Sequence, residues 1–595
     1  MRRQSFRAMV LAGLGLFAGW SLEDSVLSTA SRAMGQVAIG TSLYYGGDIV
    51  TMRGTEPEYI EALVVRDGKI LFTGSFAEAK SKAGAEAKQV NLDGKTLLPG
   101  FIDTHGHFVY FGKNLVDANL FKCSDIADLL GRMKQQAART PKGSWIVGFG
   151  YQPREMKEGR PPTIEELDQV SAEIPVMVVD SSGHLGAGNS AAFRAAGVTA
   201  DTPDPTGGAF SRKPDSKALA GPMEETALNA VRSQRPPFST ELAAQAILGA
   251  SKVWASYGQT TAMEAGLGLG NDDIAIVTHA IDAKLLPIDL YIAAKDSALD
   301  DSLAASYSIA SQYNPQAGSV VAKLRAFRPD LDKRYINRAR LGGVKFWLDG
   351  SLDTAWFTQP YTVTPQGKTS PFSGYRQIPD EVLDAAFDKY WPTELQIHMH
   401  MNGDAAADQA LSAISKAVKK HGMRDARPVF VHASWLRTDQ IERVKSYGAI
   451  PSFLTSGIIP GGDAVVKLWG AERSAGAMAS RSFLRSGLTF TFSHDAPVSP
   501  EPSILALVDS GVNRLSGTGQ VVGPDERIPP YHALRAVTSM AAYLIKEEKS
   551  KGTLEVGKLA DLVILDRNPM KVEPTSIKDI HVEETIKEGQ TVFKR

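Results

Sequence analysis

Cysteine is almost absent from this sequence: Cys123 is the only one among 595 residues. A single thiol excludes a disulfide within the chain and a zinc site built from several thiolates. Any metal ion must therefore be held by histidine nitrogens, carboxylate oxygens or a less usual ligand.

An excess of charge of one sign is also missing, because 65 Lys and Arg residues oppose 66 Asp and Glu residues. A formal net charge of −1 gives no general reason to expect nucleic acid as a partner. We expect a small-molecule substrate instead, and the sequence leaves a homo-oligomer open. The length predicts two or three domains, or one large barrel with additions.

The N-terminus has the pattern of a targeting segment. The basic stretch MRRQSFR precedes the apolar run AMVLAGLGLFAGW, which is too short to span a bilayer. Small residues follow, and Ala30 or Ala33 could precede a cleavage point. We predict a signal peptide over residues 1–33, a periplasmic or secreted protein, and no stable membrane span after processing. Arg2 and Arg3 loosely resemble a twin-arginine signal, and an uncleaved anchor is the alternative.

Short β-like patterns occupy both ends of the remaining chain. Residues 42–98 include ALVVRDGKILFTG, which alternates around an Asp-Gly turn, and residues 553–595 repeat this style. We predict that the two pieces form one small β-sandwich.

Eight apolar, strand-like runs alternate with helical stretches between these ends. Such runs are typical of parallel strands buried on both faces, and eight of them predict an α/β fold with a TIM-like (β/α)8 barrel. We place the barrel at residues 99–552, with an insertion of about residues 108–259 after its first strand. The eight runs are TLLPGFIDTH, TTAMEAG, LLPIDLYIAA, RLGGVKFWLDG, ELQIHMH, RPVFVHAS, AIPSFLTS and LTFTFSHDAPV.

Two histidines stand one residue apart at the end of the first run, in PGFIDTHGH. Residues at i and i+2 of a strand share a face, so His105 and His107 can share one metal ion. The alternative is a polar strand end with two solvated histidines.

Other strand ends carry further ligand types, and chemistry in such barrels lies at the C-terminal strand ends. Buried histidines are often hydrogen-bonded core residues, but several at equivalent positions favour a metal site. The predicted metal ligands are His105, His107, Lys345, His400, His432 and Asp495.

Lys345, in GVKFWLDGS, needs a separate explanation because an unpaired buried ammonium is costly. It could form a salt bridge with Asp349 or Asp495. Alternatively, carbon dioxide converts the amine into a carbamate whose two oxygens bridge two divalent ions. The histidine count suits such a pair of ions, with Asp495 beside the first.

Taken together, these motifs resemble the metal-dependent amidohydrolase superfamily, and more closely its YtcJ-like branch, which includes N-substituted formamide deformylases. The resemblance covers about residues 42–595 and rests on PGFIDTHGH, DSSGHLGAGNSAAF, GVKFWLDGSL, HMNGDAAAD, SHDAPV and GTLEVGKLADLVILD. HMNGD departs from a HAIGD-like run of the family, and SHD departs from GSD.

The resemblance implies hydrolysis of a non-peptide C–N bond, in an amide or N-substituted formamide, by a metal-activated hydroxide. It implies two divalent ions, for which zinc suits the ligand set best, bridged by carboxylated Lys345. Asp495 would act as general base and then as general acid. The alternatives are a lactone, carbamate or phosphotriester hydrolase, and a non-catalytic regulatory or binding protein with a damaged ligand set.

A second group of residues has weaker predicted roles. His184 could hydrogen-bond the substrate carbonyl as a catalytic residue, or be an ordinary loop histidine. Asp404 could orient His400 through its second ring nitrogen or cap a helix. His398 is the rival of His400 as a ligand. The candidates for an apolar substrate pocket are Phe108, Tyr110, Tyr151, Trp347 and Phe357.

Overall fold

A computed structural model describes residues 40–299 and 335–595, apart from residues 182, 184, 206–207, 271, 336, 366–367 and 460. The predicted signal segment, residues 1–33, and the predicted catalytic residue His184 therefore lie outside the described residues. No helix in the described part of the chain is both long and apolar enough to cross a bilayer.

The centre of the molecule is an eight-stranded sheet in which every neighbouring pair is parallel. Each of the eight apolar runs contributes one strand to this sheet, and the strands follow one another in chain order. They are β6 (Phe101–Ile102), β13 (Gln259–Leu267), β14 (Asp289–Lys295), β15 (Ala339–Trp347), β16 (Gln396–Met401), β17 (Val429–His432), β18 (Ile450–Phe453) and β19 (Thr491–Phe492).

The sheet curls so that the C-terminal ends of its first and last strands meet. The Thr104 hydroxyl donates to the carbonyl oxygen of Phe492 at 3.2 Å, and the amide of Asp495 donates to the carbonyl of His105 at 2.9 Å. A curled parallel sheet of this order is consistent with a TIM-like barrel. Every residue of β13 is buried, which explains why such strands read as continuous apolar runs.

The first apolar run differs from the prediction because it divides between two sheets. Its first part forms β5 (Thr96–Pro99), which pairs with strands of the chain ends, and its second part forms β6. Gly100 lies at the change of direction, where a Cβ atom would come within 2.4 Å of Thr260 Cγ2. The close approach of the segments that carry Gly100 and Thr260 therefore requires glycine.

Helices follow the strands of the central sheet and cover it. In α14 (Asp404–His421), Ala407, Leu411 and Ile414 are buried at helical spacing, and the last turn is basic. The other helices of this region are α3 (Phe108–Val116), α8 (Thr240–Ser256), α9 (Asp273–Asp282), α13 (Asp380–Tyr390), α15 (Thr438–Tyr447), α16 (Thr455–Ile458), α17 (Gly462–Trp469), α18 (Ala471–Ala475), α19 (Ser480–Arg485), α20 (Ile504–Asn513), α21 (Pro530–Ala536) and α22 (Ser539–Leu544).

Strands from both ends of the chain share a second sheet, in the order β22-β21-β20-β5-β1-β2-β3, with β4 paired to β1. Helix α2 (Phe76–Ala83) packs against β2. The division of these strands into a two-layered sandwich remains a prediction, as do the domain boundaries. The strands not yet bounded are β1 (Ser42–Val50), β2 (Tyr59–Arg66), β3 (Lys69–Gly74), β4 (Lys88–Asn91), β20 (Leu562–Leu565), β21 (Val582–Lys587) and β22 (Gln590–Lys594).

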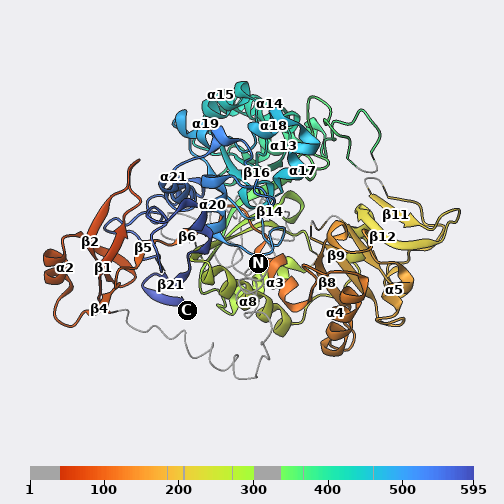
Figure 1. Cartoon of the computed structure of the whole chain (residues 1–595), viewed down its shortest axis with the longest axis horizontal. Helices are drawn as coiled ribbons and strands as arrows, with labels where there is room; N and C mark the ends of the chain where they lie inside the picture. The colour runs from red at the N-terminus through yellow and green to blue at the C-terminus, as the bar shows by residue number, and fades with distance from the viewer. Residues whose placement is uncertain are drawn as a thin grey trace, which may run out of the picture.

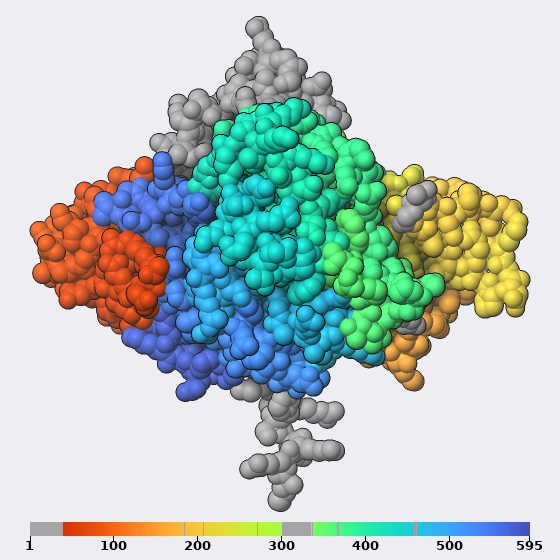
Figure 2. Space-filling model, turned by 90° about the horizontal axis from the view of Figure 1, so that it is seen from above, coloured from red at the N-terminus to blue at the C-terminus, as the bar shows by residue number. Residues whose placement is uncertain are grey.

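A third sheet, of six strands, comes from the chain between β6 and β13, in the order β11-β12-β10-β9-β8-β7. The third sheet and the sheet of the chain ends lie on opposite sides of the central region (Figures 1 and 2). Its elements are β7 (Ala118–Asn119), α4 (Ile126–Arg139), β8 (Ile146–Tyr151), α5 (Ile164–Asp168), β9 (Val176–Asp180), β10 (Leu185–Gly188), α6 (Ser190–Ala195), β11 (Gly208–Arg212), β12 (Leu219–Glu225) and α7 (Thr226–Arg232).

Candidate metal centre

Four histidine rings form a continuous row at the C-terminal ends of β6, β16 and β17. The ring centroids of His107 and His105 are 5.3 Å apart, and those of His105 and His432 are 5.0 Å apart. His432 and His400 follow at 4.6 Å. The structure therefore brings together all four histidines that the sequence nominated as ligands.

Asp495, just after β19, faces three of these rings. Its Oδ1 atom lies 3.2 Å from Nε2 of His105 and 3.3 Å from Nε2 of His107, and its Oδ2 atom lies 3.8 Å from Nε2 of His432. The backbone φ angles of His432 and Asp495 are +67° and +55°. Such strained conformations of residues other than glycine cluster at functional sites, where the surrounding structure holds them.

Lys345 on β15 is 1% exposed, and its Nζ atom has no hydrogen-bond partner among the described residues. Neither Asp349 nor Asp495 forms the salt bridge that was one of its two predicted roles. Burial lowers the pKa of Lys345 to about 7, although Asp495 acts in the opposite direction. Nζ lies 5.4 Å from the ring centroid of Trp347, two residues along the strand.

The donor atoms fit a metal ion. One ligand atom from each of His105, His432 and Asp495 can be chosen so that all three lie within 4.8 Å of one another. Nδ1 of both histidines and Nζ of Lys345 are buried without a hydrogen-bond partner within the described ranges. Oδ1 of Asp495 faces the Nε2 atoms of His105 and His107. Buried polar atoms are seldom left unpaired, and nitrogen and oxygen donors gathered in this way suit a divalent cation.

Electrostatics keep three of the candidate ligands, His105, His432 and Asp495, ready for a cation. Burial lowers the pKa of His105 and His432 well below the usual value, so both imidazoles are neutral and can donate lone pairs. Burial alone would raise the pKa of Asp495, but His105, His107 and His432 hold it well below its usual range. The carboxylate is therefore ionised at neutral pH.

The outer partner of His400 is Asp349, so the first of the two alternative roles of Asp404, holding this ring, is wrong. Nδ1 of His400 lies 3.1 Å from Oδ1 of Asp349, which also accepts the amide of Asn402 at 2.9 Å.

Asp404 begins α14 but turns away from His400. Its carboxylate accepts the amide and hydroxyl of Thr358 at 3.0 and 2.6 Å and pairs with Arg437 at 2.7 Å. The alternative of a helix cap is not met either, because Gly403 is the N-cap residue of α14 and no side chain caps the helix.

Two further carboxylates near the site were missed in the sequence. Asp103 accepts the amide of His105 at 2.9 Å and the indole N–H of Trp254 at 3.2 Å. Glu264 on β13 is 2% exposed, and its Oε1 atom lies 3.9 Å from Nδ1 of His107. A carboxylate inside the apolar run TTAMEAG was the only signal that could have found Glu264.

His398 lies outside the row of rings. It is fully buried, its Nε2 atom lies 3.4 Å from the hydroxyl of Tyr291, and burial lowers its pKa to about 3. The choice of His400 over His398 as the candidate ligand is therefore supported by the 4.6 Å approach of His400 to His432.

The predicted apolar pocket is reduced to two of its five candidates. Phe108, Tyr151 and Phe357 are at most 2% exposed and belong to packed cores. Tyr110 and Trp347 are half-buried, so only these two retain surface that a substrate could contact. Sequence periodicity could not separate the two groups, because both consist of aromatic residues and their burial depends on tertiary packing.

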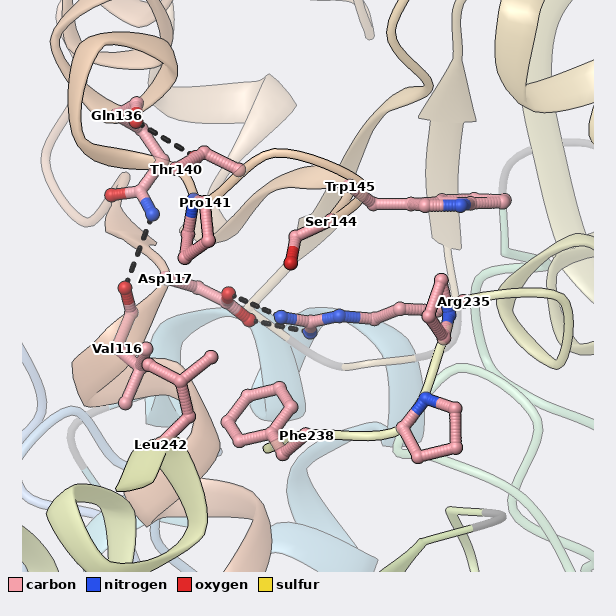
Figure 3. Close-up of a pocket in the computed structure, with 12 residues that line it drawn as sticks. Val116, Asp117, Gln136, Thr140, Pro141, Ser144, Trp145, Arg235, Phe238 and Leu242 are labelled. Carbon is pink, nitrogen blue, oxygen red and sulfur yellow. Dashed lines mark hydrogen bonds and ion pairs between the residues drawn. The ribbon is translucent and has the colours of Figure 1, made fainter. Parts of the chain in front are cut away.

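A separate pocket lies between the end of α3 and the loop before α8 (Figure 3). Arg235 forms two hydrogen bonds with Asp117, at 2.7 and 2.8 Å, and its guanidinium lies 4.7 Å from the ring centroid of Phe238. None of the twelve residues that line this pocket is a predicted site residue. Its cation and carboxylate already neutralise each other.

Comparisons with known proteins agree with the geometry. Residues 88–593 match the family described as "Amidohydrolase family". The chain is 26% identical over 568 residues to putative amidohydrolase YtcJ of Bacillus subtilis, covering 93% of this chain and 99% of that protein. It is 25% identical over 548 residues to the N-substituted formamide deformylase of Arthrobacter pascens, covering 90% and 95%. An uncharacterized metal-dependent hydrolase from Pyrococcus furiosus matches with a TM-score of 0.69 at 25% identity, over 89% of this chain and 100% of that one.

Proposed function

Because the chain belongs to the amidohydrolase family, as its motifs predicted, we propose that it hydrolyses a non-peptide C–N bond in a small amide or N-substituted formamide. The observation that carries this proposal is the group of buried nitrogen and oxygen donor atoms gathered at the ends of the central strands. The similarity to a formamide deformylase supports the choice of bond.

Six residues would hold two divalent ions. Divalent ions bound here would make a water molecule more acidic and polarise the substrate carbonyl. Zinc suits nitrogen and oxygen ligands without a thiolate best. His105 and His107 would serve one ion, His400 and His432 the other, with Lys345 between them and Asp495 beside the first.

Asp495 is placed to move the proton. Its carboxylate is ionised and lies between the histidine rings, so it can accept a proton from the attacking water. The same oxygen then delivers that proton to the departing nitrogen, which leaves as a neutral amine.

Lys345 is suited to carboxylation. A pKa of about 7 leaves much of the amine neutral near neutral pH, and only the neutral nitrogen can attack carbon dioxide. The nitrogen lone pair forms the new N–C bond while one C–O π bond of carbon dioxide opens to an oxyanion. The nitrogen gives up one proton to solvent, and a carbamate anion results. Because the Nζ atom has no hydrogen-bond partner in the described residues, carboxylation would break no existing hydrogen bond there.

The position of Trp347 favours a substrate that carries an apolar substituent. Its half-buried indole lies beside Lys345 at the end of β15, where it offers apolar surface next to the donor atoms. We therefore propose substrates whose nitrogen or acyl group carries an apolar or aromatic portion.

The proposal is tested by metal analysis and a substrate panel. We expect close to two divalent ions per chain and hydrolysis of N-formyl or N-acyl compounds, and Lys345→Ala should lose both. Fewer than one ion per chain, or unchanged turnover by Lys345→Ala, would overturn the proposed centre. Faster hydrolysis of lactones or phosphotriesters would replace the amide assignment.

A further inference from the structure

Glu264 makes contacts that connect a strand of the central sheet, a helix and a candidate ligand. Its Oε2 atom accepts the amide of Val109 at 2.7 Å, and its Oε1 atom accepts the amide of Gly266 at 3.0 Å. Oε1 also lies 3.9 Å from Nδ1 of His107. One buried carboxylate thus faces the start of α3, its own strand end and the imidazole.

Helix α3 needs this contact because its first residues lack a local cap. His107 occupies the N-cap position but makes no capping hydrogen bond with its side chain. Its ring is instead turned toward Asp495, with Nε2 at 3.3 Å from Oδ1. The unpaired amides of a first helical turn need an acceptor, and Glu264 supplies one from the neighbouring strand.

The surrounding backbone holds the His107 ring close to Glu264. The amide of Ala265 donates to the carbonyl of Gly106 at 2.9 Å, and the amide of His107 donates to the carbonyl of Ala496 at 2.8 Å. A Cβ atom on Gly266 would lie 3.2 Å from Nδ1 and from Cε1 of the ring. The ring is therefore confined between β13 and the segment that carries Asp495.

We propose that Glu264 is a positioning residue for His107: it keeps the proton of the imidazole on Nδ1 and so leaves Nε2 free to bind a cation. A movement of about 1 Å brings Nδ1 and Oε1 within hydrogen-bond distance. Carboxylates in this position fix both the orientation and the tautomer of a metal-binding histidine. The inference rests on the proposed function, because it assigns His107 to a metal ion.

The test separates the effect on His107 from a general loosening of α3. Glu264→Gln keeps the size of the side chain and removes its charge. Lys113→Met is the matched control, because Lys113 anchors the same helix to Asp272 and Asp273 without contacting His107. Zinc affinity is measured by chelator competition, and the cobalt-substituted proteins are compared by absorption spectroscopy.

We expect Glu264→Gln to weaken the affinity for one ion about 10- to 100-fold and to change the cobalt spectrum. Lys113→Met should keep the wild-type affinity and spectrum even if its melting temperature falls. In a His107→Ala background, Glu264→Gln should cause no further loss of affinity, because its effect passes through the missing ring.

Three outcomes would overturn the assignment. They are wild-type affinity in Glu264→Gln, an equal loss in Lys113→Met, and an additional loss in the His107→Ala background. If the wild-type chain binds two ions normally in any of these cases, only the role of Glu264 is rejected. Absence of metal from the wild-type chain would reject this role and the proposed function together.

Discussion

The imidazole of His400 and the carboxylate of Asp349 face each other at 3.1 Å, and the same carboxylate accepts the amides of Asn402 and Gly403. Asp349 is fully buried, so its orientation is fixed by these contacts. It thereby fixes the ring of His400 beside His432.

Asp349→Asn should lower the affinity for metal by about 10- to 100-fold, because the amide is a weaker partner for the ring nitrogen of His400. Zinc retention during dialysis against a chelator measures the effect. Asp404→Asn is the control: its carboxylate pairs with Thr358 and Arg437, so it should lose stability but retain metal. Equal metal loss in both variants would show that Asp349 has no special role.

Lys345→Met should stabilise the metal-free protein while abolishing metal binding. The folded-state pKa of Lys345 is about 7 and the ordinary value is 10.5, so folding disfavours the charged amine. The penalty is complete below about pH 7 and disappears as the pH rises to about 10.5, since the unfolded chain then also loses the proton. The shift corresponds to roughly 5 kcal/mol at most.

Urea unfolding of chelator-treated wild type and Lys345→Met at pH 6, 8 and 10 measures this difference. The advantage of the variant should shrink steadily with rising pH. A difference that stays constant across the three pH values would mean that the wild-type amine is not destabilised by burial.

The strands and the candidate ligands were predictable from sequence for one physical reason. Parallel strands buried on both faces appear as apolar runs, and a polar residue at the end of such a run, such as His432 or Lys345, stands out. The spacing of His105 and His107 added a local signal. These features depend only on neighbouring residues, so no knowledge of the tertiary structure was needed.

The supporting residues could not be predicted because their partners are remote in the chain. Glu264 acts on a helix that begins more than 150 residues earlier, and no fixed spacing reports that contact. Asp404 was a candidate partner of His400 because it lies only four residues further along the chain. Its position at the start of α14 directs its carboxylate toward Thr358 instead. Burial of Phe357 likewise depends on packing that periodicity does not reveal.

Removal of metal should destabilise the wild-type protein. A ligand that binds only the folded state stabilises it by about 2.7 kcal/mol at a free concentration 100 times its dissociation constant. We expect the thermal transition to shift down after chelation and to recover when zinc is added. His432→Ala should abolish the response, whereas His421→Ala, at an exposed ion pair with Asp388, should keep it. A full response in His432→Ala would remove that residue from the centre.

Lys587→Met should destabilise the protein without changing its metal content. Lys587 on β21 is fully buried, and its Nζ atom lies 2.8 Å from both Asp289 Oδ2 and Asp561 Oδ2. Its removal leaves the buried carboxylate of Asp561 without its cation, whereas Asp289 keeps Lys551 and Arg338. Breaking a buried pair in this way costs about 3–5 kcal/mol in the free energy of unfolding.

Metal content should be unchanged in Lys587→Met because Asp289 begins β14, whereas the candidate ligands follow the opposite ends of the strands. Lys416→Met is the control, since Lys416 forms an exposed pair with Asp384 and should change the urea midpoint little. Loss of metal in Lys587→Met at a temperature where the protein is folded would show that the sheet of the chain ends and the metal centre are coupled. An unchanged free energy of unfolding would show instead that the ion pairs of Lys587 do not stabilise the packing of the sheet of the chain ends against the central sheet.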